Sequence, residues 1–249
     1  MSERLAILTG GATGIGAAIL RRLRMMNYKT LVIGLSPPAP DQVVFARHDL
    51  TAQEEIEGAV QDVRAFLSEH GRPADILINN AGGGMPCRAE SLSAEVLAND
   101  ISLNLVAPML LSAAVLPGMK LAGRGVIVNV ASTAGRTGVA YLHGYAAAKA
   151  GLLAFTQSLA IECAPDGIRV NAVCPGAVES EMAAKGRAEL SQLRGLAPEI
   201  YERGMANATG LGRLLTPNEV AEVVCWVAEG SERPMTGQAI NVCGTIEMS

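Results

Sequence analysis

The feature that most constrains the fold is a regular alternation of short apolar runs with longer amphipathic segments. The runs are rich in Val, Ile and Leu, and the segments between them repeat apolar residues every three or four positions. Strands and helices that alternate in this way form right-handed crossovers, which make the strands parallel and place helices on both faces of the sheet. The sequence therefore predicts an α/β fold with a doubly wound parallel sheet of about seven strands.

The apolar runs predict strands over 5–9, 30–35, 43–47, 76–79, 126–131, 168–174 and 238–242. The amphipathic segments predict helices over 14–26, 52–70, 94–121 (as two helices), 145–163, 198–207 and 217–229, the last capped by Thr216 with Glu219 at its third position. The segment 175–215 is expected to be irregular outside its one helix, and connections of this length are usually functional lids or disordered. We expect a single domain over 1–249 with a substrate lid around 179–214, because no linker-like stretch divides the chain.

Composition excludes several classes of partner. The formal net charge is −4 and no basic run is present, which argues against nucleic acid or anionic lipid as a partner. The most apolar stretch, 103–119, is interrupted by Pro108 and Pro117 and is too short to cross a bilayer. The N-terminus has no signal-peptide pattern, and the 5 cysteines are widely spaced without a CxxC motif. We therefore expect a cytoplasmic protein with reduced thiols and no metal site.

A glycine-rich stretch, Thr9-Gly-Gly-Ala-Thr-Gly-Ile-Gly16, follows the first predicted strand and precedes a helix. In a parallel sheet such a turn lies at the carboxyl edge, where the free N–H groups and the positive dipole end of the helix face outward. Glycines here would let a pyrophosphate approach the backbone. The spacing differs from GxGxxG, so a tight turn that needs glycine only for its backbone angles is the alternative interpretation.

The end of the second predicted strand bears on the choice of dinucleotide. An acidic side chain at this place normally binds the ribose hydroxyls of the unphosphorylated cofactor. The chain has Leu35 and Ser36 instead, and the strand end is uncertain by a residue, so both are candidates. A missing carboxylate permits a 2′-phosphate, but no Arg or Lys follows the strand to attract it, and position 13 is Thr rather than a base. NADP(H) is slightly favoured and NAD(H) remains an alternative.

Four side chains further along the chain form a candidate reaction centre. Tyr145 and Lys149 are four residues apart in a run of helix formers, so both project from one helix face. An ammonium beside a phenol would lower the phenol pKa from its ordinary ~10. Such a pair is usually only a solvated helix face, but Ser132 ends the strand 126–131 at the edge where ligands bind. Asn104 lies in an apolar helical pattern, where a carboxamide needs a partner.

In order and spacing, these motifs resemble the short-chain dehydrogenase/reductase family over essentially the whole chain, particularly its 3-oxoacyl-[acyl-carrier-protein] reductase-like branch. The matching pieces are Thr9-Gly10-x3-Gly14-Ile15-Gly16, Asp49-Leu50, Asn79-Asn80-Ala81-Gly82, Asn104, Ser132, Tyr145-x3-Lys149 and Pro175-Gly176. The resemblance implies a Rossmann-like domain that transfers a hydride between NAD(P)(H) and a ketone or secondary alcohol. The chain departs from the family pattern at Cys243-Gly244-Thr245, where Asp-Gly-Gly is common.

The resemblance also implies a catalytic tetrad. Tyr145 would act as general acid in ketone reduction and as general base in alcohol oxidation. Lys149 would lower the Tyr145 pKa and hold the nicotinamide ribose. Ser132 would bind the substrate oxygen and stabilise its developing charge. Asn104 would kink its helix and hold a water that links Lys149 to solvent.

The same resemblance assigns the cofactor contacts, with the pyrophosphate on the glycine turn, the adenosine on the next two strand ends and the nicotinamide beyond the sixth strand. The residues implied are Gly10, Thr13, Gly14, Ile15, Gly16, Leu35, Ser36, Asp49, Leu50, Asn80, Ala81, Gly82, Tyr145, Lys149, Pro175, Gly176, Val178 and Ser180. Homotetramers are usual in the family, so a homotetramer or dimer is expected. The apolar stretch 146–160 would suit the subunit interface and would equally suit a core helix.

The substrate is left open by the sequence. Its pocket is expected to be walled by Gly83, Gly84, Met85, Pro86, Ala134, Gly135, Arg136, Tyr141, His143 and the lid, with Met182, Met205, Arg187, Arg194 and Arg203 as lid candidates. This mixture fits a 3-oxoacyl thioester and fits a bulky aryl or alicyclic ketone about as well. The alternatives to a ketoreductase are a catabolic secondary-alcohol, aryl-alcohol or polyol dehydrogenase and a non-catalytic cofactor-sensing regulator, although such regulators tend to lose the Tyr or the Lys.

Overall fold

In the part of the chain that the structure describes, the sheet has seven strands, all parallel, in the order β3-β2-β1-β4-β5-β6-β7. The computed structural model describes residues 4–39, 43–230 and 234–248. The strands are β1 (Arg4–Thr9), β2 (Tyr28–Gly34), β3 (Val44–Arg47), β4 (Ile76–Asn79), β5 (Gly125–Val130), β6 (Ile168–Pro175) and β7 (Ala239–Val242). The predicted doubly wound parallel sheet is confirmed. The strand order reverses between β1 and β4, and the carboxyl ends of strands at such a reversal are where open α/β sheets bind ligands.

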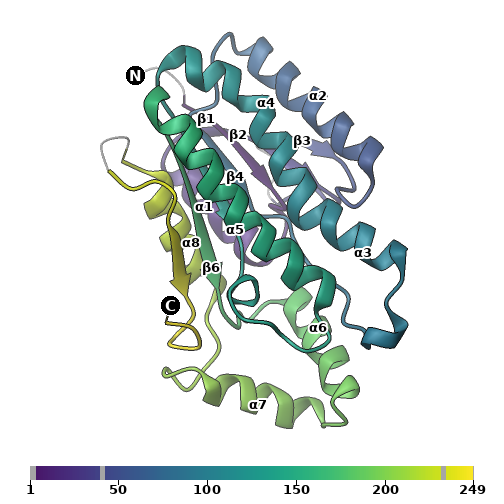
Figure 1. Cartoon of the computed structure of the whole chain (residues 1–249). Helices are drawn as coiled ribbons and strands as arrows, with labels where there is room; N and C mark the ends of the chain where they lie inside the picture. The colour runs from purple at the N-terminus through teal and green to yellow at the C-terminus, as the bar shows by residue number, and fades with distance from the viewer. Residues whose placement is uncertain (1–3, 40–42, 231–233, 249) are drawn as a thin grey trace.

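Helices cover both faces of this sheet (Figure 1). They are α1 (Gly14–Met25), α2 (Gln53–Glu69), α3 (Ala94–Ile101), α4 (Ala107–Ala122), α5 (His143–Cys163), α6 (Glu181–Leu193), α7 (Pro198–Ala208) and α8 (Pro217–Ala228), with a π-helical turn at Ser102–Val106 and 3-10 turns at Ala89–Ser91, Thr133–Gly135 and Ala164–Asp166. Leu77 of β4 packs in the cluster with α2, α4 and α5, whereas the next residue, Ile78, packs in the cluster with α1 and α8. Burial on both faces explains why the strands are continuously apolar.

The joined stretch Ala94–Ala122 is long and apolar enough to cross a membrane by length and composition alone. In this fold it is interrupted by the π-helical turn, and Leu111, Val115 and Met119 of α4 belong to the apolar cluster on one face of the sheet. The stretch is therefore a core element of the fold, as the interrupted apolar pattern indicates.

The segment 179–214, which the sequence analysis expects to be a substrate lid and which we call the lid below, contains more helix than predicted. The helix predicted over 198–207 is present as α7, but the prediction of irregular structure before it is wrong, because α6 occupies Glu181–Leu193. The Ser180 side chain caps α6 by accepting a hydrogen bond from the Ala183 N–H at 3.2 Å. Both lid helices lie beyond the carboxyl end of the sheet (Figure 1).

The two ends of the lid are joined at its base. Val178 and Leu215 form an isolated parallel bridge. The Leu215 N–H donates to the carbonyl oxygen of Ala177 at 2.9 Å, and the Glu179 N–H donates to that of Leu215 at 2.7 Å. Because both ends are tied to each other, the lid leaves and rejoins the sheet at one place.

Three predicted element ends can be compared directly with the structure. Strand β2 ends at Gly34, so Leu35 and Ser36 both follow the strand. Helix α5 begins two residues before Tyr145, at His143. The capping box of α8 is confirmed, since the Thr216 hydroxyl and the Glu219 carboxylate each accept a hydrogen bond from the other's backbone N–H.

Candidate active site

Close backbone contacts build the glycine turn between β1 and α1. Gly10 has φ of 71°, a left-handed conformation that favours glycine. A Cβ on Gly16 would lie 1.7 Å from the Gly10 carbonyl oxygen, so α1 can approach the turn only without a side chain there. The Asn80 side-chain amide donates to the carbonyl oxygens of Thr9 at 3.0 Å and Gly10 at 2.8 Å. Asn80 therefore holds the turn against the end of β4.

The first turn of α1 offers backbone donors to an anion. Its N-cap, Thr13, makes no side-chain capping hydrogen bond, and the turn carries no acidic residue. The free N–H groups and the helix dipole favour a negative group here, which suits a pyrophosphate. The adjacent cavity measures about 480 Å³, and its lining includes Gly10, Thr13, Gly14, Ile15, Gly16, Leu35, Ser36, Asp49, Leu50, Asn80, Ala81, Gly82 and Ser180.

A second cavity, of about 290 Å³, contains the remaining predicted contacts. Its lining includes Ser132, Tyr145, Lys149, Pro175, Gly176 and Val178. Ile15, Asn80, Gly82 and Ser180 line both cavities, so the two join into one cleft along the carboxyl edge of the sheet. The structure thus brings together every predicted cofactor residue, and Asn104 alone of the predicted tetrad lies behind the cleft, fully buried.

Three predicted catalytic groups converge in the second cavity. Tyr145 lies on the first turn of α5, and a hydrogen bond joins its hydroxyl to that of Ser132. The Ser132 oxygen also accepts a hydrogen bond from the Ala134 N–H at 3.1 Å, which fixes its position. Lys149, buried one turn further along α5, donates to the Val130 carbonyl oxygen at 2.8 Å, and its Nζ lies 5.7 Å from the centroid of the Tyr145 ring.

The Tyr145 pKa differs from the expectation. Burial raises the Tyr145 pKa above its ordinary value of 10.0, and the hydrogen bond to Ser132 opposes that rise. Burial also lowers the Lys149 pKa to about 8. The expected lowering of the Tyr145 pKa is therefore wrong for this structure, because desolvation of the phenol is the largest effect. A neutral phenol at neutral pH is suited to donate a proton.

Asn104 organises the backbone behind the cleft. The helix that carries it widens into the π-helical turn Ser102–Val106. The Asn104 side-chain amide donates to the carbonyl oxygens of Gly83 at 2.7 Å and Asp100 at 2.8 Å, and its oxygen accepts from the Gly83 N–H at 3.2 Å. A Cβ on Gly82 would lie 2.9 Å from this oxygen and 3.0 Å from the Lys149 Nζ, so Gly82 leaves the space between them open.

The structure also places a cation that the sequence analysis missed. Arg47, at the end of β3, pairs in register with Gly34, which lines the larger cavity beside Leu35. The Arg47 side chain is exposed. No base follows β2 in the sequence, yet the neighbouring strand supplies one at that edge. The signal was available, because strands predicted at 30–35 and 43–47 are consecutive and consecutive strands are usually neighbours.

The expected substrate wall is only partly present. Of its members, Gly83, Gly84, Pro86, Met182 and Arg187 line the smaller cavity. Arg187 is buried, donates to the Val178 carbonyl oxygen at 3.0 Å and pairs with Glu202 at 3.1 Å. Arg136 instead donates to the Ala239 carbonyl oxygen, away from the cavity lining. The lid cation next to the reaction centre is thus already partnered.

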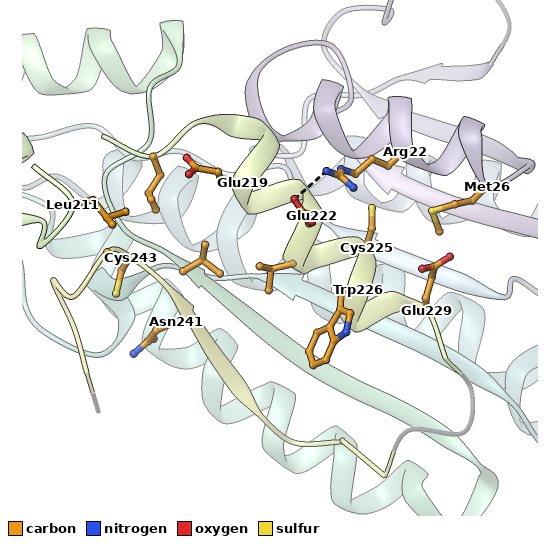
Figure 2. A pocket seen from close by; sticks show the side chains of 14 residues that line it. Arg22, Met26, Leu211, Glu219, Glu222, Cys225, Trp226, Glu229, Asn241 and Cys243 are labelled. Atoms are coloured by element: carbon orange, nitrogen blue, oxygen red, sulfur yellow. Dashed lines mark hydrogen bonds and ion pairs between the residues drawn. The ribbon is translucent and has the colours of Figure 1, made fainter. Parts of the chain in front are cut away.

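A separate hollow of about 690 Å³ lies between α1, α8 and the C-terminal segment (Figure 2). Arg22 and Glu222 form an ion pair of 3.3 Å beside it, and Trp226 of α8 is half exposed at its rim. None of the predicted site residues lines this hollow. In the described ranges of the chain, no group of three or more His, Cys, Asp and Glu side chains could hold a metal ion. The cleft at the carboxyl edge is therefore the candidate active site.

Comparisons with known proteins identify the family of the chain. The model of the short chain dehydrogenase family matches residues 4–191. A Streptomyces virginiae protein named as a ketoacyl reductase of the monensin polyketide synthase is 36% identical, over 98% of this chain and 97% of its own. Acetoacetyl-CoA reductase of Shinella zoogloeoides is 31% identical, over 97% and 98%. The structure of a single-substitution variant of actinorhodin polyketide ketoreductase with NADPH superimposes with a TM-score of 0.88 at 33% identity, over 98% and 97%. The chain belongs to the short chain dehydrogenase family.

Proposed function

We propose that the protein is an NADP(H)-dependent oxidoreductase that interconverts a ketone and a secondary alcohol, with Tyr145 as its general acid and base. The observation that carries the proposal is the pair of Tyr145 and Ser132, whose hydroxyls interact in the smaller cavity, which joins the cavity of the glycine turn. A non-catalytic regulator would have no use for a buried Lys149 beside this pair.

The cleft fits a dinucleotide. The free N–H groups of α1 would hold the pyrophosphate, Leu35 and Ser36 would meet the adenosine ribose, and Asp49 with Leu50 would flank the adenine. The nicotinamide half would lie among Pro175, Gly176, Val178 and Ser180. When bound, the cofactor supplies the hydride, and every other task falls to the side chains of the chain.

The protein handles the proton and the charge on the substrate oxygen. In carbonyl reduction, the neutral Tyr145 hydroxyl donates its proton to that oxygen, and the Ser132 hydroxyl donates a hydrogen bond to it as negative charge develops. Lys149 holds its ammonium near the phenol and favours the phenolate that proton donation leaves behind. Water in the space over Gly82, between Asn104 and Lys149, would return a proton from solvent.

The sharper form of the proposal is reduction of a 3-oxoacyl thioester. The ketoacyl and acetoacetyl-CoA reductases to which the chain is similar along nearly its whole length support this substrate class. One observation favours a second candidate, a dehydrogenase of uncharged alicyclic or aryl alcohols. The lining of the smaller cavity is largely apolar, with Leu142, Met182 and Leu190, and its lid cation, Arg187, is bound to Glu202.

NADP(H) is the preferred cofactor in this proposal. The similar actinorhodin ketoreductase is solved with NADPH, no acidic residue lies at the end of β2 to repel a 2′-phosphate, and Arg47 supplies a cation at that edge. NAD(H) is the alternative, since Leu35 and Ser36 do not bind a phosphate by charge.

The proposal also covers the oligomeric state and the cellular location of the protein. We propose a homotetramer or dimer in the cytoplasm, without nucleic acid or membrane as a partner. The exposed face of α5 supports a helix seam, because Ala147, Ala150 and Ala154 are small residues at helical spacing and Ile161 is 79% exposed. All five cysteines are free, as a reducing compartment requires.

The test is the initial rate of NADPH and of NADH oxidation with acetoacetyl-CoA, for the natural chain and for Tyr145→Phe. We expect a rate that falls at least ~1,000-fold in the variant, while NADPH binding followed by its fluorescence changes little, because the ring of residue 145 is kept. The ratio of the two cofactor rates measures the preference. A Tyr145→Phe rate equal to that of the natural chain would refute the mechanism. Turnover of cyclic secondary alcohols without thioester reduction would favour the second candidate.

A further inference from the structure

The buried residue of helix α3 is an acid, Asp100. Asp100 is 5% exposed, and it is the one buried residue of Ala94–Ile101, while the acid in the first turn of the helix, Glu95, is exposed. A carboxylate loses hydration when it is buried, so this placement costs free energy unless donors replace the water. The backbone N–H groups of Met85 and Tyr145 face the Asp100 carboxylate and lower its pKa, although burial is the larger effect and raises that pKa above its ordinary value.

The contact with the Tyr145 N–H replaces a cap that α5 lacks. The N-cap residue of α5 is Leu142, which has no side-chain acceptor, and the first turn carries no acid of its own. Tyr145 is the third residue of the helix, and its N–H is one that an N-cap side chain ordinarily accepts. Asp100 therefore caps α5 from the neighbouring helix, and its charge also complements the positive end of the helix dipole.

Two glycines and a second side chain fit this arrangement. A Cβ on Gly144 would lie 2.6 Å from the Asp100 Oδ2, so the carboxylate reaches the helix only because residue 144 has no side chain. One turn along the same helix, Asn104 binds both the N–H and the carbonyl oxygen of Gly83. Asp100 and Asn104 thus fix the loop after β4 at two points and join it to the first turn of α5.

We propose that Asp100 is a positioning residue for Tyr145, whose buried carboxylate caps α5 from α3 and so fixes the helix turn that carries the phenol. This inference deepens the proposed function and rests on it for its kinetic part. Asp100 touches the Tyr145 backbone and not the reacting atoms. Its negative charge is among the causes that raise the Tyr145 pKa.

Other titratable groups face the phenol and set the background for this effect. Lys149 lies on the same helix, Cys174 faces the phenol from β6 and raises its pKa, and the lid brings Arg187 to the same cavity, where it is paired. His143 is exposed on the first turn of α5. Removing the Asp100 charge leaves all four in place, so we expect the Tyr145 pKa to fall.

Two variants and a matched control separate capping from charge. Asp100→Asn keeps the shape and one acceptor oxygen but removes the charge, whereas Asp100→Ala removes both acceptors. Glu95→Gln removes one negative charge from the exposed side of the same helix. For Asp100→Asn we expect the Tyr145-controlled limb of the kcat profile to move down by about half a pH unit or more. For Asp100→Ala we expect kcat to fall about ten-fold or more, with the NADPH Kd within about two-fold of the natural value.

Two further readouts need no turnover. Amide hydrogen exchange in peptides that cover 143–147 should accelerate about ten-fold or more in Asp100→Ala and stay unchanged in Glu95→Gln. The alkaline ultraviolet titration of Tyr145, taken as the difference from a Tyr145→Phe background, should move to lower pH in Asp100→Asn. If no ketone is turned over, these two readouts still decide the inference while the proposed function fails. Unchanged exchange at 143–147, or pH profiles of Asp100→Asn that match those of Glu95→Gln, would overturn it.

Discussion

The two walls of the cleft are built in opposite ways. On the glycine turn, a Cβ on Gly16 would lie 1.7 Å from a backbone oxygen, whereas a Cβ on Gly186, in the lid helix that lines the other end of the cleft, would meet no atom within 4 Å. The glycine turn has no space for a side chain at Gly16, whereas the lid has space for one at Gly186. This difference agrees with the proposed function, in which the glycine turn binds the cofactor and the lid determines which substrate is accepted.

The lid is also held differently. The buried residues of α6 are Arg187, Leu190 and Ser191, so polar groups make up most of its inner face. Its buried charge is matched by Glu202 of α7 and by the Val178 carbonyl oxygen. The glycine turn, by contrast, is held by backbone contacts and by Asn80. The comparison predicts that substitutions in the turn act mainly on cofactor binding and stability, and that substitutions in the lid act mainly on the substrate.

The largest effect is expected for Gly16→Ala. The new methyl group would collide with the Gly10 carbonyl oxygen, so either the turn or the helix must move. We expect the NADPH Kd to rise about 100-fold or more and the free energy of unfolding to fall by about 2–3 kcal/mol. Fluorescence titration with NADPH and urea unfolding measure the two quantities. An affinity within three-fold of the natural one would show that the turn is as adaptable as the lid.

A smaller effect, of opposite sign on stability, is expected for Lys149→Met. Lys149 is 2% exposed, and its pKa falls from 10.5 unfolded to about 8 folded, so the unfolded chain binds the proton more tightly and the buried charge destabilises the fold. After allowing for the lost hydrogen bond to the Val130 carbonyl oxygen, removal of the charge should stabilise the ligand-free protein by about 1–2 kcal/mol at pH 7. Turnover should be lost.

The pH dependence checks the cause. Below pH 8 the lysine is protonated in both states and the full penalty is present, and above 10.5 it is neutral in both and no penalty remains. The advantage of Lys149→Met should therefore shrink as pH rises through this window, as followed by urea unfolding. Lys120→Met, at a partly exposed site with Glu162 as partner, is the control and should give no stabilisation. A Lys149→Met protein that is less stable than the natural chain at pH 7 would contradict the account.

The smallest effect is expected for Gly186→Ala. The site is in the interior of α6 with space around it, so alanine should raise the free energy of unfolding by about 0.5–1 kcal/mol through helix propensity. The NADPH Kd should stay unchanged, while the ketone KM should shift by about three-fold at most, since residue 186 lines the substrate cavity. A change in cofactor affinity would mean that the two walls are coupled.

The same contrast explains what the sequence could predict. Strand positions follow from apolar runs that burial on both faces requires, and the glycine turn follows from glycines that no other residue could replace. Helix α6 was missed because its inner face carries Arg187 and Ser191, which weakens the apolar period. The signal that could have found it is local, since Ser180 is a good N-cap before a run of helix formers.

The sequence also predicts the site only in part. The positions of Tyr145, Lys149, Ser132 and Asn104 could be predicted because their types and spacing are unusual, but their pKa values could not, because desolvation depends on the whole surrounding fold. Asp100 could not be predicted either, since an acid on a helix is ordinarily solvated and only the packing of α3 against α5 makes it a cap.

The bridge at the base of the lid has a consequence for how such a protein can change. Because Val178 and Leu215 pair with each other, the backbone between them forms a loop whose two ends are held together. This pairing does not depend on which residues make up the loop. The entropy of closing such a loop grows only slowly with its length. We therefore expect that the lid can be lengthened, shortened or replaced by another segment. The register of β6 with β7 and the geometry of the glycine turn should then stay unchanged.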